Sequence, residues 1–173
     1  MFNQKRVVID HVSPQLNGGD FFIKRVVQQP ITVDAHVLVD GHDVIAASVL
    51  YKHEKERKWT EARMHHTVND EWQATIIVEK QGFYTYKVEG WVDHALNWQH
   101  GIERKIDDGQ KVFSELLEGA EYLKAILKKA SKSEKDYLTN CISLFKDSSK
   151  YDEAITEAKS ERIHKILIKY PEK

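Results

Sequence analysis

Apolar and polar residues alternate along much of the first hundred positions. The clearest case is residues 31–39, where every second side chain is apolar, and this period of two is typical of a half-buried β-strand. Turn residues follow at 40–43 and a β-branched apolar run at 44–51, so a β-hairpin is predicted here. Further strands are predicted at 21–27, 59–64, 72–78 and 84–92. About six or seven short strands with frequent turns favour an antiparallel β-sandwich.

The last of these strands carries an aromatic pattern. Tyr84 and Tyr86 fall on one face of a strand that leaves the turn at Gly82. This spacing lets both rings pack inward while their hydroxyl groups reach the backbone, and it resembles the late strand of immunoglobulin-like domains. The predicted sandwich is therefore immunoglobulin-like.

From about residue 102 the apolar period changes to 3.6 residues, which is typical of amphipathic helices. Ser133 and Asp136 imitate a capping box at the start of one of them. Short connections between antiparallel helices predict a small three-helix bundle. The helices are predicted at residues 113–130, 133–145 and 151–170.

The two parts of the chain also differ in composition. All eight Gly and all four Trp occur at or before Gly119. The chain is accordingly assigned to the α+β class, with an immunoglobulin-like β-sandwich domain at residues 1–101 and a helical bundle domain at residues 102–173.

Charge and hydropathy exclude several partners. The 173 residues contain 26 Lys and Arg against 27 Asp and Glu, a net charge of −1, so there is no general attraction for nucleic acids or anionic membranes. No apolar stretch approaches the roughly 18 to 20 residues that span a bilayer, and the N-terminus lacks the apolar segment of a signal peptide. A cytoplasmic location without nucleic-acid or membrane partners is expected.

Histidine is the first candidate for chemistry. His65 and His66 adjoin in the sequence, but neighbours on a regular strand point to opposite faces, so from such a strand they cannot both bind one metal ion. A second group of candidate residues consists of Asp93, His94, His100 and Glu103. A self-standing enzyme whose active site is built from this group is the least favoured hypothesis, and no metal or cofactor is expected.

Acidic pairs and the single cysteine give no catalytic residue either. Asp107 and Asp108 lie in a charged run at the expected strand-to-helix junction, where a helix N-terminus favours acids without any glycosidase role. Cys141 lies in an apolar helix stripe, which predicts a buried, inert thiol. Nucleophile-elbow and phosphate-binding glycine motifs do not occur.

The tryptophans are the candidates for binding sugar, because exposed aromatic rings on strands can stack on sugar faces. Trp72 shares a face with Ala74 and Ile76, which predicts a core position, whereas Trp91 shares a face with charged residues and is predicted to be exposed. Trp91 is therefore the candidate carbohydrate contact, and an α-glucan-binding module is the alternative function. All four tryptophans, Trp59, Trp72, Trp91 and Trp98, are expected on or beside sandwich strands.

A set of motifs occurs in a defined order along residues 5–120. They are 6–14 (RVVIDHVSP), 17–27 (NGGDFFIKRVV), 40–47 (DGHDVIAA), 69–72 (NDEW), 82–86 (GFYTY) and 90–94 (GWVDH), followed by Trp98 and 103–105 (ERK). This ordered set resembles the N-terminal region of bacterial α-1,4-glucan:maltose-1-phosphate maltosyltransferases. The later helices resemble that family mainly in their general character and not in specific motifs.

The resemblance implies a fold and a function. Members of this family have a central barrel similar to that of α-amylases, and they elongate α-1,4-glucan by transferring maltosyl units from maltose 1-phosphate. The family's catalytic Asp and Glu belong to that barrel, so this chain is expected to be a non-catalytic N-terminal region. Its expected partners are its own catalytic barrel, a second copy in a homodimer, and α-glucan; an unpaired sheet edge would favour self-association.

Overall fold

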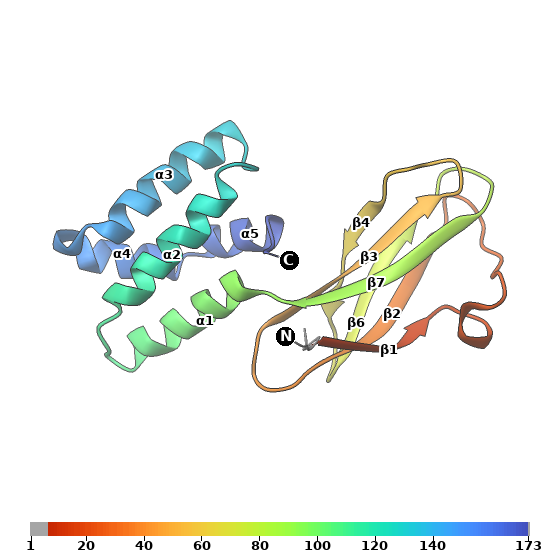
Figure 1. Ribbon diagram of the computed structural model, residues 1–173, viewed down its shortest axis with the longest axis horizontal. Coiled ribbons are helices and arrows are strands. Elements are labelled where there is room, and N and C mark those ends of the chain that lie inside the picture. Colours follow the sequence, from red (N-terminus) through yellow and green to blue (C-terminus); the bar gives the residue numbers. More distant parts are fainter. Residues whose placement is uncertain (1–6, 173) are drawn as a thin grey trace, which may run out of the picture. The chain divides into compact units, whose positions relative to one another are not determined.

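The protein, seen here as a computed structural model, is described for residues 7–172, so Arg6 at the start of the first motif lies outside the described residues. The chain divides into two compact units, Met1–Val92 and Asp93–Lys173 (Figure 1). Within the described residues, strands form two antiparallel sheets in the first unit and five α-helices lie in the second. This confirms the α+β class. No helix in residues 7–172 is long and apolar enough to cross a membrane.

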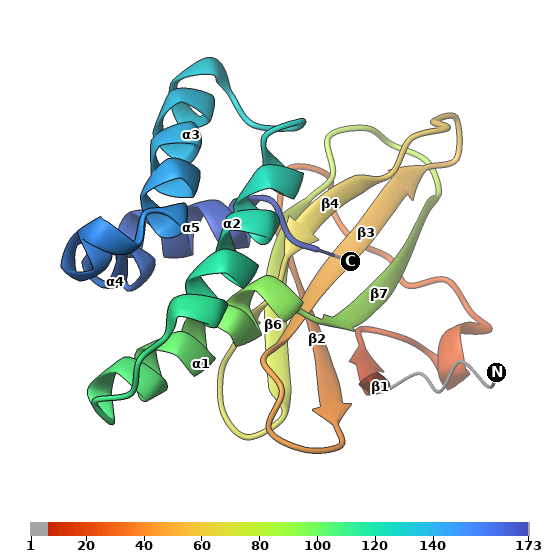
Figure 2. The ribbon, with the colours of Figure 1, turned by 60° about the vertical axis from the view of Figure 1, so that its left-hand side comes forward.

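Across residues 7–92, the first unit forms a four-stranded and a three-stranded sheet (Figure 2). The strand order is β1-β2-β6-β5 in the larger sheet and β4-β3-β7 in the smaller. The strands are β1 (Val7–Ser13), β2 (Pro30–Val39), β3 (Ile45–His53), β4 (Thr60–Arg63), β5 (His65–His66), β6 (Glu71–Ile77) and β7 (Tyr84–Val92). Neither β1 nor β5 was predicted from the alternation of residues.

The hairpin predicted across residues 31–51 is wrong. β2 pairs with β1 and β6, whereas β3 pairs with β4 and β7. Val33 of β2 and Val49 of β3 are both at most 1 % exposed and belong to one hydrophobic cluster. The two strands therefore bury their apolar sides in a shared core instead of pairing edge to edge, and the turn at 40–43 connects the two sheets.

This cluster draws side chains from both sheets. Trp72 packs against it partly buried, and Ala74 and Ile76 on the same face are members, which confirms the predicted core face of that strand. Removing this apolar surface from water is the main favourable contribution to folding. The buried members are Val33, Ala35, Val37, Ala47, Val49, Met64, Ala74 and Ile76.

Residues 14–29 connect β1 to β2 without forming a strand. The strand predicted at 21–27 is therefore wrong. This segment has one short 3-10 turn, Asn17–Gly19, and a single bridge between Leu16 and Phe21. Phe21 and Phe22 are 64 % and 77 % exposed, so consecutive apolar residues here lack the buried face that selects a regular strand.

Where the sequence predicted three helices, the described residues of the second unit form five. Helix α1 was missed, and the predicted third helix is interrupted after Ala158 and continues from Glu161. The helices are α1 (His94–Asp107), α2 (Phe113–Ile126), α3 (Lys132–Lys146), α4 (Tyr151–Ala158) and α5 (Glu161–Lys169).

Capping side chains fix where three of these helices begin. Asp93 accepts a hydrogen bond from the Leu96 amide at 3.1 Å before α1, and Ser160 accepts one from the Ile163 amide at 3.2 Å before α5. A capping box joins Ser131 and Glu134 at the start of α3, so the box predicted two residues later is wrong. Each cap satisfies amides that the first helical turn leaves without partners.

Candidate functional site

Trp91 lies on β7 opposite Ala46 of β3. Because strand side chains alternate between faces and Val88 packs on the hydrophobic core, Trp91 points away from that core. Trp91 is half-buried and not exposed as predicted, and the guanidinium carbon of Arg63 lies 4.8 Å from its ring centroid. This is a cation–π contact, so Trp91 is part of an aromatic and cationic group on the outer face of the three-stranded sheet.

A second group of this kind surrounds Trp59, which precedes β4 and is 37 % exposed. The ammonium groups of Lys52 and Lys87 lie 4.8 Å and 5.3 Å from its ring centroid, and Lys87 also pairs with Glu89 at 2.5 Å. No local pattern in the sequence indicates this group, because its members come from three strands or their ends. Only the pairing of β3 with β4 and β7 brings them together.

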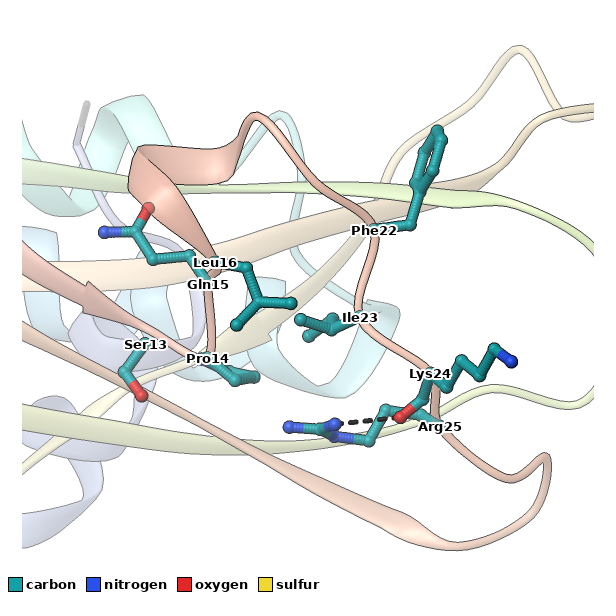
Figure 3. Close-up of a pocket in the computed structure, with 8 residues that line it drawn as sticks. All are labelled: Ser13, Pro14, Gln15, Leu16, Phe22, Ile23, Lys24 and Arg25. Carbon is teal, nitrogen blue, oxygen red and sulfur yellow. Dashed lines mark hydrogen bonds between the residues drawn. The ribbon is translucent and has the colours of Figure 1, made fainter.

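An open pocket of about 520 Å³ lies in the 14–29 connection (Figure 3). Leu16 and Ile23 point toward one another across it, whereas the Phe22 ring and the Lys24 ammonium group extend away. Arg25 donates a hydrogen bond to the Lys24 carbonyl oxygen at 2.8 Å. The pocket is lined by Ser13, Pro14, Gln15, Leu16, Phe22, Ile23, Lys24 and Arg25.

The hydroxyl groups of the β7 tyrosines reach the backbone as predicted, and the ring of Tyr86 packs against the core. The Tyr86 hydroxyl donates to the Pro14 carbonyl oxygen at 2.8 Å, and the Tyr84 hydroxyl accepts from the Lys80 amide at 3.3 Å. Burial raises the pKa of Tyr86, against the opposing influence of the Arg25 charge. These hydroxyl-to-backbone bonds hold the pocket wall and the turn before β7 in place.

The histidines and their neighbouring acids lie at separate places. His65 and His66 are exposed on β5, and the His66 ring packs against Trp72 with centroids 5.6 Å apart. Asp93 is the buried cap of α1, while His94 and His100 on that helix are exposed. Within residues 7–172, no three His, Cys, Asp or Glu side chains are arranged to hold a metal ion.

The expectation for Asp107 and Asp108 requires correction. They lie at the C-terminal end of α1, because that helix begins at His94, well before the junction that was expected. Asp107 pairs with Lys159 at 2.6 Å. Cys141 is buried on α3 as predicted, and burial raises the pKa of its thiol to about 11.

Trp98 was expected on or beside a strand, but it lies in α1 and is 5 % exposed. Its indole Nε1 donates a hydrogen bond to the Glu115 carbonyl oxygen at 2.6 Å, and its ring packs directly over Gly119 of α2. Trp98 is thus a structural residue that joins two helices.

Comparison with known proteins matches residues 5–173 to the family described as alpha-1,4-glucan:maltose-1-phosphate maltosyltransferase, domain N/S. The chain belongs to this domain N/S family. The match confirms the resemblance read from the ordered motifs. It also extends beyond residue 120, through all the helices of the second unit.

Curated relatives of this N/S-domain chain are named alpha-1,4-glucan:maltose-1-phosphate maltosyltransferase. That of Chlorobaculum tepidum is 36 % identical over 98 % of this chain and 25 % of its own length. The Methylacidiphilum infernorum protein is 37 % identical over 67 % of this chain and 17 % of its own length, and the Salinibacter ruber protein is 34 % identical over 83 % and 22 %. The N/S-domain chain therefore spans a quarter or less of the relatives it matches.

Proposed function

We propose that this chain acts as the non-catalytic N-terminal region of a maltosyltransferase that elongates α-glucan from maltose 1-phosphate. The observation that carries the proposal is the match of residues 5–173 to the N/S domain of enzymes with that name. The aligned part is 25 % of the Chlorobaculum tepidum enzyme, and the catalytic barrel is assigned to the part outside it.

The proposed architecture is an immunoglobulin-like sandwich followed by an insertion-type helical bundle. The shared core of the two sheets supports the sandwich. The hydrogen bond from Tyr86 to Pro14 supports the immunoglobulin-like description, since a late-strand tyrosine that bonds to an earlier backbone carbonyl is a feature of such domains.

The proposed role is to assemble a homodimer and to support the catalytic barrel. Phe113 and Leu117 support a dimer contact on the helical unit, because they are 45 % and 51 % exposed although they belong to the apolar stripe of α2. Residues four apart share one side of a helix. Adjacent exposed apolar side chains of this kind are typical of protein–protein contacts.

The test is a chimaera in which this chain replaces the aligned quarter of the Chlorobaculum tepidum enzyme. We expect the chimaera to sediment as a dimer and to transfer maltosyl units from maltose 1-phosphate to glucan, while the chain alone releases no phosphate. Leu117→Lys should weaken the dimer, and Val68→Lys, an equally exposed position in the first unit, should not. Turnover by the isolated chain, or a folded but monomeric chimaera, would contradict the proposal.

A second candidate function is α-glucan binding through Trp91. Its half-buried ring on the outer face of β7 favours this, with Arg63 able to hold the ring in position. Electrophoresis through gels that contain glycogen should retard the chain, and free maltoheptaose should reverse the retardation. Trp91→Ala should abolish the retardation without unfolding the protein, while Trp59→Ala, just before β4 of the same sheet, should leave the retardation unchanged. Unchanged mobility in glycogen would reject this candidate.

A further inference from the structure

Four large apolar side chains form an exposed cluster on the first unit, called here the phenylalanine patch. It consists of Leu16, Phe21, Phe22 and Phe83, which are 51 %, 64 %, 77 % and 55 % exposed. The rings of Phe22 and Phe83 lie 4.7 Å apart, and the backbones of Leu16 and Phe21 form a bridge. The patch thus joins the 14–29 connection to the turn before β7, which lies far away in the sequence.

The backbone beneath the patch is anchored on both sides. The Pro14 carbonyl accepts the hydrogen bond from Tyr86, and the Gln28 amide donates to the Val78 carbonyl at 2.8 Å. Between these anchors, the Asn17 side chain donates to Asp20 at 2.8 Å. An apolar surface that is ordered in advance loses less conformational entropy when a partner covers it.

Two cations border the patch. Lys24 and Arg25 line the same pocket as Leu16 and Phe22 (Figure 3). Within residues 7–172, neither of these two side chains forms an ion pair with a carboxylate. Charge complementarity therefore favours a partner that places carboxylates beside an apolar surface.

The chemistry of the patch favours a protein partner over a sugar. Its side chains are phenyl and isobutyl groups without hydrogen-bonding atoms, and the Lys24 and Arg25 side chains beside it form stronger hydrogen bonds with carboxylates than with the neutral hydroxyl groups of a sugar. Three phenyl rings and a leucine provide a few hundred Å², a suitable centre for an interdomain interface of about 600 to 1,500 Å². An exposed apolar patch of this size is typical of an interaction site.

We propose that the phenylalanine patch is the docking surface for the remaining part of a longer maltosyltransferase polypeptide, which covers it with an apolar surface flanked by carboxylates. This inference rests on the proposed function. The relatives carry three quarters or more of their length outside the aligned region. A polypeptide of the relatives' length would therefore supply a large protein partner for the patch.

Amide hydrogen exchange tests the proposal in the isolated chain and in the chimaera with the Chlorobaculum tepidum enzyme. Amides of residues 15–25 and 81–84 should exchange about tenfold more slowly in the chimaera, which corresponds to about 1.4 kcal/mol of added protection. Phe22→Ser combined with Phe83→Ser should restore fast exchange. Val68→Ser is the matched control, because Val68 is 53 % exposed and lies outside the patch.

The outcomes separate the partners. If the chimaera is active and dimeric but its patch amides exchange as fast as in the isolated chain, the docking proposal is wrong and the proposed function stands. If the chimaera is folded and monomeric but its patch amides are protected, the proposed function is wrong and the docking proposal stands. Protection that appears in the isolated chain as its concentration rises overturns the proposal in favour of a second copy. Protection by added glycogen overturns it in favour of carbohydrate. Mixing the chain with the separately produced remainder of the enzyme should reproduce the protection in trans.

Discussion

Gly119 is the position where a single added methyl group should have the largest effect on the helical unit. It lies in the middle of α2, where Trp98 of α1 packs against its backbone. A Cβ at this position would lie 2.7 Å from Cη2 of the indole, and closer still to Cε2 and Cζ2. Real Cβ atoms do not approach ring carbons so closely, so Gly119→Ala must displace the Trp98 ring.

Two opposing effects set the magnitude. Replacing glycine by alanine inside a helix stabilises it by about 0.5 to 1 kcal/mol. Overpacking a buried contact costs about 1 to 3 kcal/mol, and breaking the 2.6 Å bond from Trp98 to the Glu115 carbonyl leaves buried polar groups unpaired at about 1 to 3 kcal/mol more. The steric cost wins, and we expect a net loss of about 2 kcal/mol in the free energy of unfolding.

Urea unfolding followed by the helical circular dichroism signal measures this loss. Gly101→Ala is the matched control, because Gly101 is also helical and a Cβ there would meet no atom within 4 Å; it should stabilise the unit by about 0.5 to 1 kcal/mol. In a Trp98→Phe background, Gly119→Ala should cost less, since the clashing part of the indole is gone. Equal stability gains at positions 101 and 119 would refute the reasoning.

Three further predictions concern the helical unit. Gln99→Leu should lower the free energy of unfolding by about 1 to 3 kcal/mol, as measured by urea unfolding. Gln99 is 2 % exposed and donates to the Ala158 carbonyl oxygen at 3.1 Å, so the substitution removes this partner from a buried oxygen. An unchanged free energy of unfolding would contradict the prediction. Hydrogen bonds from Lys169, Ser131 and Tyr170 lower the pKa of Glu134 to about 2. Its contribution to stability is therefore complete above about pH 4.5 and lost as the pH falls toward 2, so Glu134→Gln should flatten this part of the pH–stability profile and Glu153→Gln should not. The Cys141 thiol, whose pKa burial raises to about 11, should react with a disulfide reagent only after unfolding; rapid labelling of the native protein would contradict its burial.

Several features of the fold follow from local pattern. The face shared by Trp72, Ala74 and Ile76 and the inward packing of Tyr86 could be read from a period of two. The apolar stripe of α2 likewise gave Leu116 and Leu123 as buried residues. These positions were predictable because the period of a single element already separates its apolar side from its polar side.

Other features could not be obtained in this way. The pattern of residues 30–51 fits a hairpin as well as it fits two strands in different sheets, since both arrangements bury the same side chains. Helix α1 was missed because its mean hydropathy is low and histidines and charged residues separate its buried positions. The group of Lys52, Trp59 and Lys87 comes from β3, β7 and the residue before β4, so no local spacing reveals it.

By itself, the sequence determined the α+β class, the family, and which side of most strands and helices is apolar. Only the tertiary structure decided that Arg63 forms a cation–π contact with Trp91, that Trp98 joins two helices, and that Phe22 and Phe83 meet in an exposed patch. The physical reason is that periodicity specifies that a face is buried, whereas its partner depends on the pairing and packing of distant elements.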